Sequence, residues 1–250
     1  MLIDYTGGVK KIFVILLCLV SPLGLRAAAP IFHATVAQMW LDHFEEYTEE
    51  EKRAFMLGTL FPDIRYIAKI SRSKTHEKGL TIKDLLQIKD PFTKGMKLHS
   101  FVDEVRNNYV DAHFLPHEYR HLAYAPQTHI KVLEDEVLYF QNKCDKKAIG
   151  AFLTHSLKEE ESFGITAQVV QEWHEQLSEC FLHPPSENYL KLKERGKGHG
   201  ALSVGTIKTI TKNLDKYKND PVIISHTNGA IAQFEHLFSE YKKNAASLKN

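Results

Sequence analysis

The stretch Phe92–Tyr109, FTKGMKLHSFVDEVRNNY, gives the clearest indication of the fold, because its apolar residues recur at the spacing of one helical face. Within it, His99 and Asp103 stand four residues apart. On a helix this spacing places both side chains on one face, about 5–6 Å apart. An imidazole and a carboxylate at that separation can share one metal ion or bind two neighbouring ions; a plain hydrogen bond between them is the alternative. The stretch predicts a helix that presents two candidate metal ligands.

The same helical spacing extends over most of the chain, and the alternating patterns typical of strands are absent from the sequence. Thr48 followed by Glu51 forms a capping-box pattern at the start of one helix. The segments are separated at 61–63, 71–80, 184–185, 196–200 and 221 by proline, glycine or polar residues. The predicted helices cover residues 33–47, 48–57, 92–109, 130–140, 146–158, 166–182, 204–217 and 229–243. The predicted fold class is therefore all-α, a single compact multi-helix domain.

Residues 1–27 have the layout of a secretory signal peptide. Lys10 and Lys11 precede an apolar run, Ile12 to Leu25, which small residues follow. The run is shorter and more interrupted than the about 20 apolar residues that span a membrane. Cleavage after Ala27 would leave 28–250 as the helical domain of a secreted or periplasmic protein. A buried first helix is the alternative interpretation.

The overall charge excludes a protein that acts through a strong electrostatic field. The chain has 250 residues and a formal net charge of +1, and residues 28–250 alone carry −1. Neither value provides bulk attraction to nucleic acid, so no stable nucleic-acid partner is expected. Residues 28–250 retain Cys144 and Cys180, which permits one disulfide; the sequence leaves open whether they meet.

Several of the 14 histidines stand in short motifs with carboxylates. HATVA at 33–37 begins with His33, and Gly58–Asp63, GTLFPD, places a carboxylate directly after a helix-ending proline. His76 follows in a polar loop, and the pair at 99 and 103 comes next. A side chain at the edge of a loop can turn toward a site while its neighbours stay solvated. These residues are therefore candidates for one shared site.

This order of motifs resembles that of the zinc-dependent phospholipase C superfamily, which also contains the P1-type nucleases. HATVA at 33–37 looks like its first histidine motif, Gly58–Asp63 like the Gly-x-x-x-Pro-Asp element of its phospholipase branch, and KLHSFVD at 97–103 like its central metal helix. The resemblance covers roughly residues 28–140. It implies a helical domain that holds two to three Zn²⁺ ions and hydrolyses a phosphate ester.

The resemblance also implies roles for individual residues. It makes Asp63 a bridge between two ions, and it assigns catalytic roles to Asp63 and Asp103, although Asp103 could instead orient an imidazole. The family uses the amine and carbonyl of the mature N-terminal residue as a further ligand, which would be Ala28 here in place of the usual tryptophan. The implied metal ligands are His33, Asp63, His76, His99, Asp103 and His129.

The third ion has two candidate pairs, since the family holds it with a later histidine and an acid one helical turn further on. His129 stands at a family-like distance, but the nearest acids, Glu134 and Glu136, lie off its face. His155 and Glu159 have the right spacing but lie far downstream. We favour His129, and both pairs and a site with only two ions stay open.

A further motif, HEYRH at 117–121, matches the H-E-x-x-H pattern of zinc proteases. Arg120 would place a cation between the two ligands, and Pro116 and Pro126 leave a helix of barely two turns. A polar helical turn on the surface is therefore the favoured interpretation of this motif.

Together these features predict an exported zinc-dependent phosphodiester hydrolase of the phospholipase C type that uses a metal-activated water. Its expected partner is a phospholipid or another phosphodiester substrate, reached through transient contact with a membrane surface. A P1-like single-strand nuclease and a non-catalytic binding factor on the same scaffold are the alternatives. The head group, the oligomeric state and the role of residues 160–250 stay open.

Overall fold

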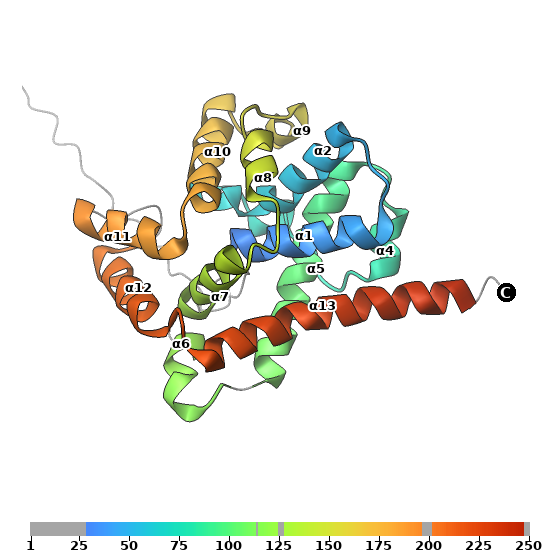
Figure 1. Cartoon of the computed structure of the whole chain (residues 1–250). Coiled ribbons are helices and arrows are strands. Elements are labelled where there is room, and N and C mark those ends of the chain that lie inside the picture. Colours follow the sequence, from blue (N-terminus) through green and yellow to red (C-terminus); the bar gives the residue numbers. More distant parts are fainter. Residues whose placement is uncertain (1–28, 114, 125–127, 197–201, 248–250) are drawn as a thin grey trace, which may run out of the picture.

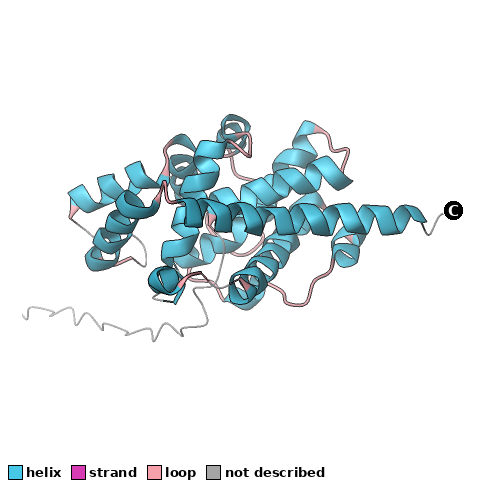
Figure 2. Ribbon diagram, turned by 60° about the horizontal axis from the view of Figure 1, so that its bottom comes forward, coloured by secondary structure: helices cyan, strands magenta, loops and turns pink. Residues whose placement is uncertain are grey.

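The described part of the chain is built of helices joined by loops (Figures 1 and 2). The computed structural model describes residues 29–113, 115–124, 128–196 and 202–247, and this part contains no strand. The predicted all-α class is confirmed. The α-helices are α1 (Pro30–Phe44), α2 (Glu49–Leu60), α3 (Arg65–Ala68), α4 (Ile82–Gln87), α5 (Pro91–Ala112), α6 (Arg120–Tyr124), α7 (Thr128–Gln141), α8 (Lys146–Phe152), α9 (Lys158–Glu161), α10 (Ala167–Leu182), α11 (Pro185–Arg195), α12 (Val204–Tyr217) and α13 (Pro221–Ser247). Short 3₁₀ helices are η2 (Phe61–Ile64), η3 (Arg72–Lys74) and η4 (His117–Tyr119).

Helix α1 lies in the middle of the molecule and contacts α2, α5, α7, α10 and α13 (Figure 1). Its apolar side chains form the larger core with aromatic residues of the C-terminal helix. The rings of Phe32 and Phe234 meet edge to face at 5.9 Å, and those of Trp40 and Phe238 at 5.5 Å. All four side chains are fully buried, and burying each contributes about 1.5–3 kcal/mol. The packing fixes α1, and with it His33, against the helices around it.

The closest helix crossing joins α2 and α5, where two glycines meet the opposite backbone. A Cβ atom on Gly58 would lie 2.1 Å from the carbonyl oxygen of Phe92, and one on Gly95 would lie 2.1 Å from that of Phe55. Only residues without a Cβ allow two helices to approach this closely. The crossing brings the end of α2, which leads to Asp63, next to the N-terminal half of α5.

A second, smaller core lies where α6, α7 and α12 meet. Leu122, Ile130, Leu133, Ile210 and Leu214 are buried in it. This cluster holds the C-terminal part of the chain, including helices predicted within 160–250, against α7. The C-terminal helices therefore complete the packing around α7 and α1.

Several predicted boundaries are confirmed. The capping box at Thr48 is present, with the Glu51 side chain accepting from the Thr48 backbone N–H. The predicted helices over 166–182 and 204–217 agree with α10 and α12 within one residue.

Three proline positions were interpreted too simply as breaks. Pro185 is the first residue of α11 and Pro221 that of α13. Pro62 follows α2 directly but lies in the first turn of η2. Proline is well tolerated in the first turn of a helix, where its missing N–H would have no intrahelical partner. A proline that follows one helix can therefore also lie in the first turn of the next one.

Other predicted segments differ from the structure in length. The predicted helix over 146–158 ends at Phe152, where Thr154 turns its hydroxyl to the carbonyl of Ala151 at 2.8 Å, and α9 begins only at Lys158. Such side-chain bonds compete with the helical ladder. The predicted loop over 71–80 contains η3, and α4 and α11 were missed altogether.

The predicted signal peptide, residues 1–27, and the predicted N-terminal ligand Ala28 lie outside the described residues. In the part of the chain that is described, no helix combines the length and apolar character needed to cross a bilayer. Cys144 and Cys180 are free thiols, so the disulfide that the sequence permitted is not formed in this structure.

Candidate metal centre

Five of the six predicted ligands converge from four separate segments. His33 comes from α1, Asp63 from η2, His76 from the loop after η3, and His99 and Asp103 from α5. They form two overlapping groups that share one histidine, and within each group the potential ligand atoms lie within 4.8 Å of one another. One group is His33, His99 and Asp103; the other is Asp63, His76 and His99.

The Asp103 carboxylate lies at the centre of the cluster. Its Oδ1 is 3.4 Å from Nε2 of His33, while its Oδ2 is 3.6 Å from Nε2 of His76 and 3.7 Å from Nε2 of His99. Each oxygen therefore faces a different side of the cluster. The bridging role that the resemblance implies for Asp63 stays a prediction.

Hydrogen bonds at the opposite ring nitrogens orient two of the imidazoles. Nδ1 of His99 donates to the carbonyl oxygen of Thr59 at 2.9 Å, which leaves the lone pair on Nε2. Nδ1 of His76 shares a hydrogen bond of 2.8 Å with the Thr75 hydroxyl. Partners of this kind fix ring orientation and tautomer in metal sites. Both Nε2 atoms are thereby turned toward Asp103.

The cluster contains buried polar atoms that lack hydrogen-bond partners within the described residues. They are both ring nitrogens of His33, Nε2 of His76 and His99, and Oδ1 of Asp63. Leaving a buried polar group unpaired costs about 1–3 kcal/mol. So many in one place indicate a site that binds something, and the donor set of imidazole nitrogens and carboxylate oxygens fits a zinc ion.

Burial favours the neutral form of the His99 and His76 imidazoles, which is the form that metal binding requires. Burial lowers the pKa of His99 to about 4, and the neighbouring His33 lowers it further against the opposing effect of Asp103. Burial also lowers the pKa of His76 strongly, helped by His99 and the cation of Arg72. The rings of His33 and His99 stack at 3.8 Å, an arrangement that two imidazolium ions would disfavour.

Two arginines accompany the two carboxylates of the centre. Nη2 of Arg72 lies 3.1 Å from Oδ2 of Asp103, and Nε of Arg65 lies 3.8 Å from Oδ1 of Asp63. Burial lowers the pKa of Lys131 on α7, while the charges of Asp63 and Asp103 act in the opposite direction. Arg65 begins the four-residue helix α3 and Arg72 the three-residue helix η3, and both elements are too short to show a periodic pattern.

A buried carboxylate anchors the beginning of α1. Oδ2 of Asp135 accepts from the backbone N–H of Ile31 at 3.0 Å, and Oδ1 accepts from that of Phe32 at 2.8 Å. Burial raises the pKa of Asp135 to about 7 even though these two bonds favour its charged form. The contact ties the turn that carries His33 to α7, over a sequence separation that no local motif reveals.

His129, the sixth predicted ligand, belongs to neither group. It is buried beside α12, and its Nδ1 accepts from Nδ2 of Asn213 at 2.8 Å. A neutral imidazole that accepts at Nδ1 carries its proton on Nε2, so it has no free lone pair for a metal. Its proposed acids are also engaged: Glu134 accepts from Arg106 at 2.8 Å, and Glu136 accepts from the backbone of Ser186 at 2.8 Å.

The other candidate motifs lie apart from the centre. His155 and Glu159 are both exposed, on different elements. In the HEYRH motif, His117 belongs to η4 and His121 to α6, and both side chains are exposed. This agrees with a polar surface turn.

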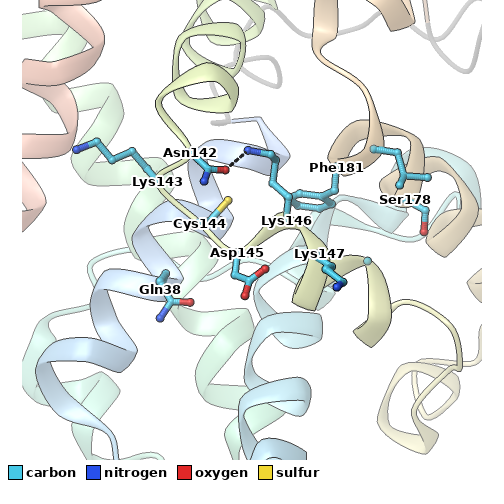
Figure 3. A pocket seen from close by; sticks show the side chains of 11 residues that line it. Gln38, Asn142, Lys143, Cys144, Asp145, Lys146, Lys147, Ser178 and Phe181 are labelled. Carbon is cyan, nitrogen blue, oxygen red and sulfur yellow. Dashed lines mark hydrogen bonds between the residues drawn. The ribbon is translucent and has the colours of Figure 1, made fainter.

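A separate cavity of about 940 Å³ opens between α1, α8 and α10 (Figure 3). Lys143, Lys146 and Lys147 line it, but Lys146 already donates to Oδ1 of Asn142 at 2.6 Å. Asp145, also in the wall, accepts from the backbone at the start of α8. None of the predicted ligands lines this cavity.

The fold and the cluster define the class of protein: an all-α chain with a buried histidine and aspartate centre of candidate metal ligands. Comparison of the chain with models of protein families, with curated proteins and with solved structures finds no match.

Proposed function

We propose that this chain is a zinc-dependent hydrolase of phosphate esters, of the phospholipase C type. The observation that carries the proposal is the centre around Asp103, where three imidazole Nε2 atoms converge on one carboxylate and have no hydrogen-bond partner among the described residues. A purely structural cluster would pair these buried atoms with each other or with the backbone.

The zinc would be held by the residues of the two overlapping groups, His33, His99 and Asp103 in one and Asp63, His76 and His99 in the other. When bound, zinc ions activate water as a nucleophile and stabilise charge on phosphoryl oxygens. The chain's own residues provide the orientation: the carbonyl of Thr59 accepts from Nδ1 of His99, which keeps the lone pair on His99 Nε2 available.

The proposed substrate is the phosphodiester of a phospholipid head group or a related molecule. The near-neutral charge of the chain supports a local phosphate site over a surface that attracts polyanions. Export through a signal peptide at residues 1–27, and transient contact with a membrane surface, belong to the same proposal. A P1-like nuclease and a non-catalytic binding factor are its alternatives.

Zinc content and hydrolysis, measured together, test this proposal. The full chain is expressed, the accumulating form is purified, and its N-terminus is determined by mass spectrometry. Zinc per chain is then measured under zinc-replete conditions, with hydrolysis of phosphatidylcholine vesicles and of single-stranded DNA assayed in parallel. We expect at least one zinc per chain and activity on the vesicles.

The matched variants are His99→Ala in the centre and His117→Ala on the surface, both of which remove one imidazole. We expect His99→Ala to reduce zinc affinity and hydrolysis by at least about 100-fold, and His117→Ala to leave both unchanged. Less than one zinc per wild-type chain would refute the enzyme, and zinc binding without hydrolysis of either substrate would favour the binding factor.

A further inference from the structure

Arg72 connects the buried centre with the solvent. Its Nη2 lies 3.1 Å from Oδ2 of Asp103, the same oxygen that faces His76 and His99. The Arg72 side chain is 41% exposed, whereas that of Asp103 is only 4% exposed. The Arg72 side chain therefore extends from the solvent to the ligand cluster, which its Nη2 atom reaches.

The turn that carries Arg72 also carries a ligand of the centre. The carbonyl oxygen of Arg72 accepts from the backbone N–H of Thr75 at 3.1 Å and from that of His76 at 2.9 Å. These bonds fix the backbone of Arg72 relative to that of His76. Arg72 therefore has a defined place beside the centre, although the 3₁₀ helix that carries it is exposed.

Arg72 has more hydrogen-bonding capacity than this contact uses. A guanidinium presents five N–H donors in a planar fork that matches two oxygens of a carboxylate or phosphate. Its side-chain hydrogen bond in the described structure comes from Nη2 alone. The remaining donors can bind an oxyanion beside Asp103.

The charges of the centre show which kind of solute these donors suit. The guanidinium groups of Arg65 and Arg72 balance the carboxylates of Asp63 and Asp103, from which they lie 3.8 Å and 3.1 Å away. Bound divalent ions would therefore leave the centre with a net positive charge. A neutral ester or amide gains little from such a field, whereas a phosphoryl group carries the negative charge that complements it.

We infer that Arg72 binds a non-bridging oxygen of a substrate phosphoryl group and thereby makes the centre specific for phosphate esters. The inference rests on the proposed function and deepens it. Arg72 remains paired with Asp103 through Nη2, and its remaining N–H donors bind the phosphoryl oxygen. The competing role for Arg72 is to position the Asp103 carboxylate. That role predicts that replacing Arg72 lowers zinc affinity and leaves phosphate affinity unchanged.

The test compares Arg72→Gln and Arg72→Lys with Lys74→Gln, which removes an exposed cation from the same short 3₁₀ helix. Zinc per chain and zinc affinity are measured by competition with a chelator. Binding of inorganic phosphate to zinc-loaded protein, freed of excess zinc, is measured by calorimetry. These readouts do not depend on catalytic activity.

We expect Arg72→Gln to keep its zinc but to bind phosphate about 10- to 100-fold more weakly, as loss of a charge-assisted hydrogen bond predicts. Arg72→Lys should fall between this variant and the wild type, because it keeps the charge without the planar fork. Lys74→Gln should match the wild type within about twofold, as expected for an exposed charge.

Loss of zinc from Arg72→Gln would overturn the inference in favour of support for Asp103, as would unchanged phosphate affinity in that variant. If wild-type protein holds zinc but does not bind phosphate, this inference fails while the metal centre stands. If the wild-type chain holds no zinc, the proposed function fails. Phosphate binding to the metal-free protein then tests whether Arg72 binds an oxyanion. Equal phosphate affinity of wild type and Arg72→Gln would then overturn it.

Discussion

Replacing Gly95 with alanine tests how the close crossing of α2 and α5 builds the centre. The new Cβ would lie 2.1 Å from the carbonyl oxygen of Phe55 and 2.7 Å from the backbone nitrogen of Thr59. Both neighbours are backbone atoms of a helix, so they cannot rotate away. Because carbon–oxygen contacts need more than 3.0 Å, the two helices must separate by roughly 1 Å, as in other overpacked cores.

The cost follows from two opposing contributions. Overpacking typically costs about 1–3 kcal/mol and occasionally more, while alanine gains about 1 kcal/mol over glycine in helix propensity. Contact with two backbone atoms places Gly95→Ala at the upper end, so we expect a net loss of about 2 kcal/mol or more. For a chain of this length the melting temperature would fall by about 4–8 °C.

The same displacement should reach the metal centre. His99 lies one helical turn after Gly95, and its ring is oriented by the carbonyl of Thr59 at 2.9 Å, directly across the crossing. A separation of roughly 1 Å breaks that hydrogen bond. We therefore expect zinc affinity to fall about 10- to 100-fold, the usual effect of losing a partner that orients a ligand.

Thermal unfolding of the metal-free protein and zinc affinity from chelator competition are the two assays. Gly150→Ala is the matched control, because Gly150 lies within α8 and a Cβ there would meet no atom within 4 Å. This control should be neutral or up to about 1 kcal/mol more stable. If Gly95→Ala is as stable as Gly150→Ala and binds zinc like the wild type, the close crossing does not position the centre.

Two further predictions concern the surroundings of the centre. Asp135→Ala leaves two buried backbone N–H groups of α1 unpaired, so the free energy of unfolding measured by chemical denaturation should fall by about 2–3 kcal/mol. The control Asp145→Ala removes an exposed helix cap and should lower it by only about 1 kcal/mol. Equal losses in the two variants would contradict a special role for Asp135 at the start of α1. Burial and the charge of Arg106 lower the pKa of His226 to about 4. Below pH ~6.5 the unfolded chain therefore binds a proton at His226 that the folded chain does not bind. Through this group the free energy of unfolding falls by about 1.4 kcal/mol per pH unit as the pH drops toward 4. The variant His226→Gln should therefore lose less stability per pH unit than the wild type, by the amount that one proton contributes. Identical slopes for the wild type and the variant over pH 4–6.5 would show that His226 is not held neutral.

The helical architecture could be predicted because it depends on local periodicity. The capping box at Thr48 and the helices that became α10 and α12 follow from spacing over a few residues. The short helix α4 carries too few turns to show a periodic pattern, and Pro185 was interpreted as a break although it begins α11. Sequence patterns therefore described the long helices better than the connections between them.

The candidate centre could be predicted in part for a different reason. The pair His99 and Asp103 is a local feature of one helix, and the order of motifs placed Asp63 with it. Arg72 and Asp135 contribute through contacts across 31 and 104 residues of sequence, which no local pattern records. Distance along the chain limits such predictions more than the chemistry of the residues does.

The same reasoning explains why His129 does not join the centre although its residue type and its place in the order of motifs fitted. Whether a histidine can bind a metal depends on the partner of its other ring nitrogen. The carbonyl of Thr59 can only accept a hydrogen bond, so it forces the proton onto Nδ1 of His99 and exposes the lone pair of Nε2. The amide of Asn213 donates to Nδ1 of His129 and produces the opposite tautomer. One partner thus prepares a ligand and the other removes one, and both partners come from helices distant in sequence.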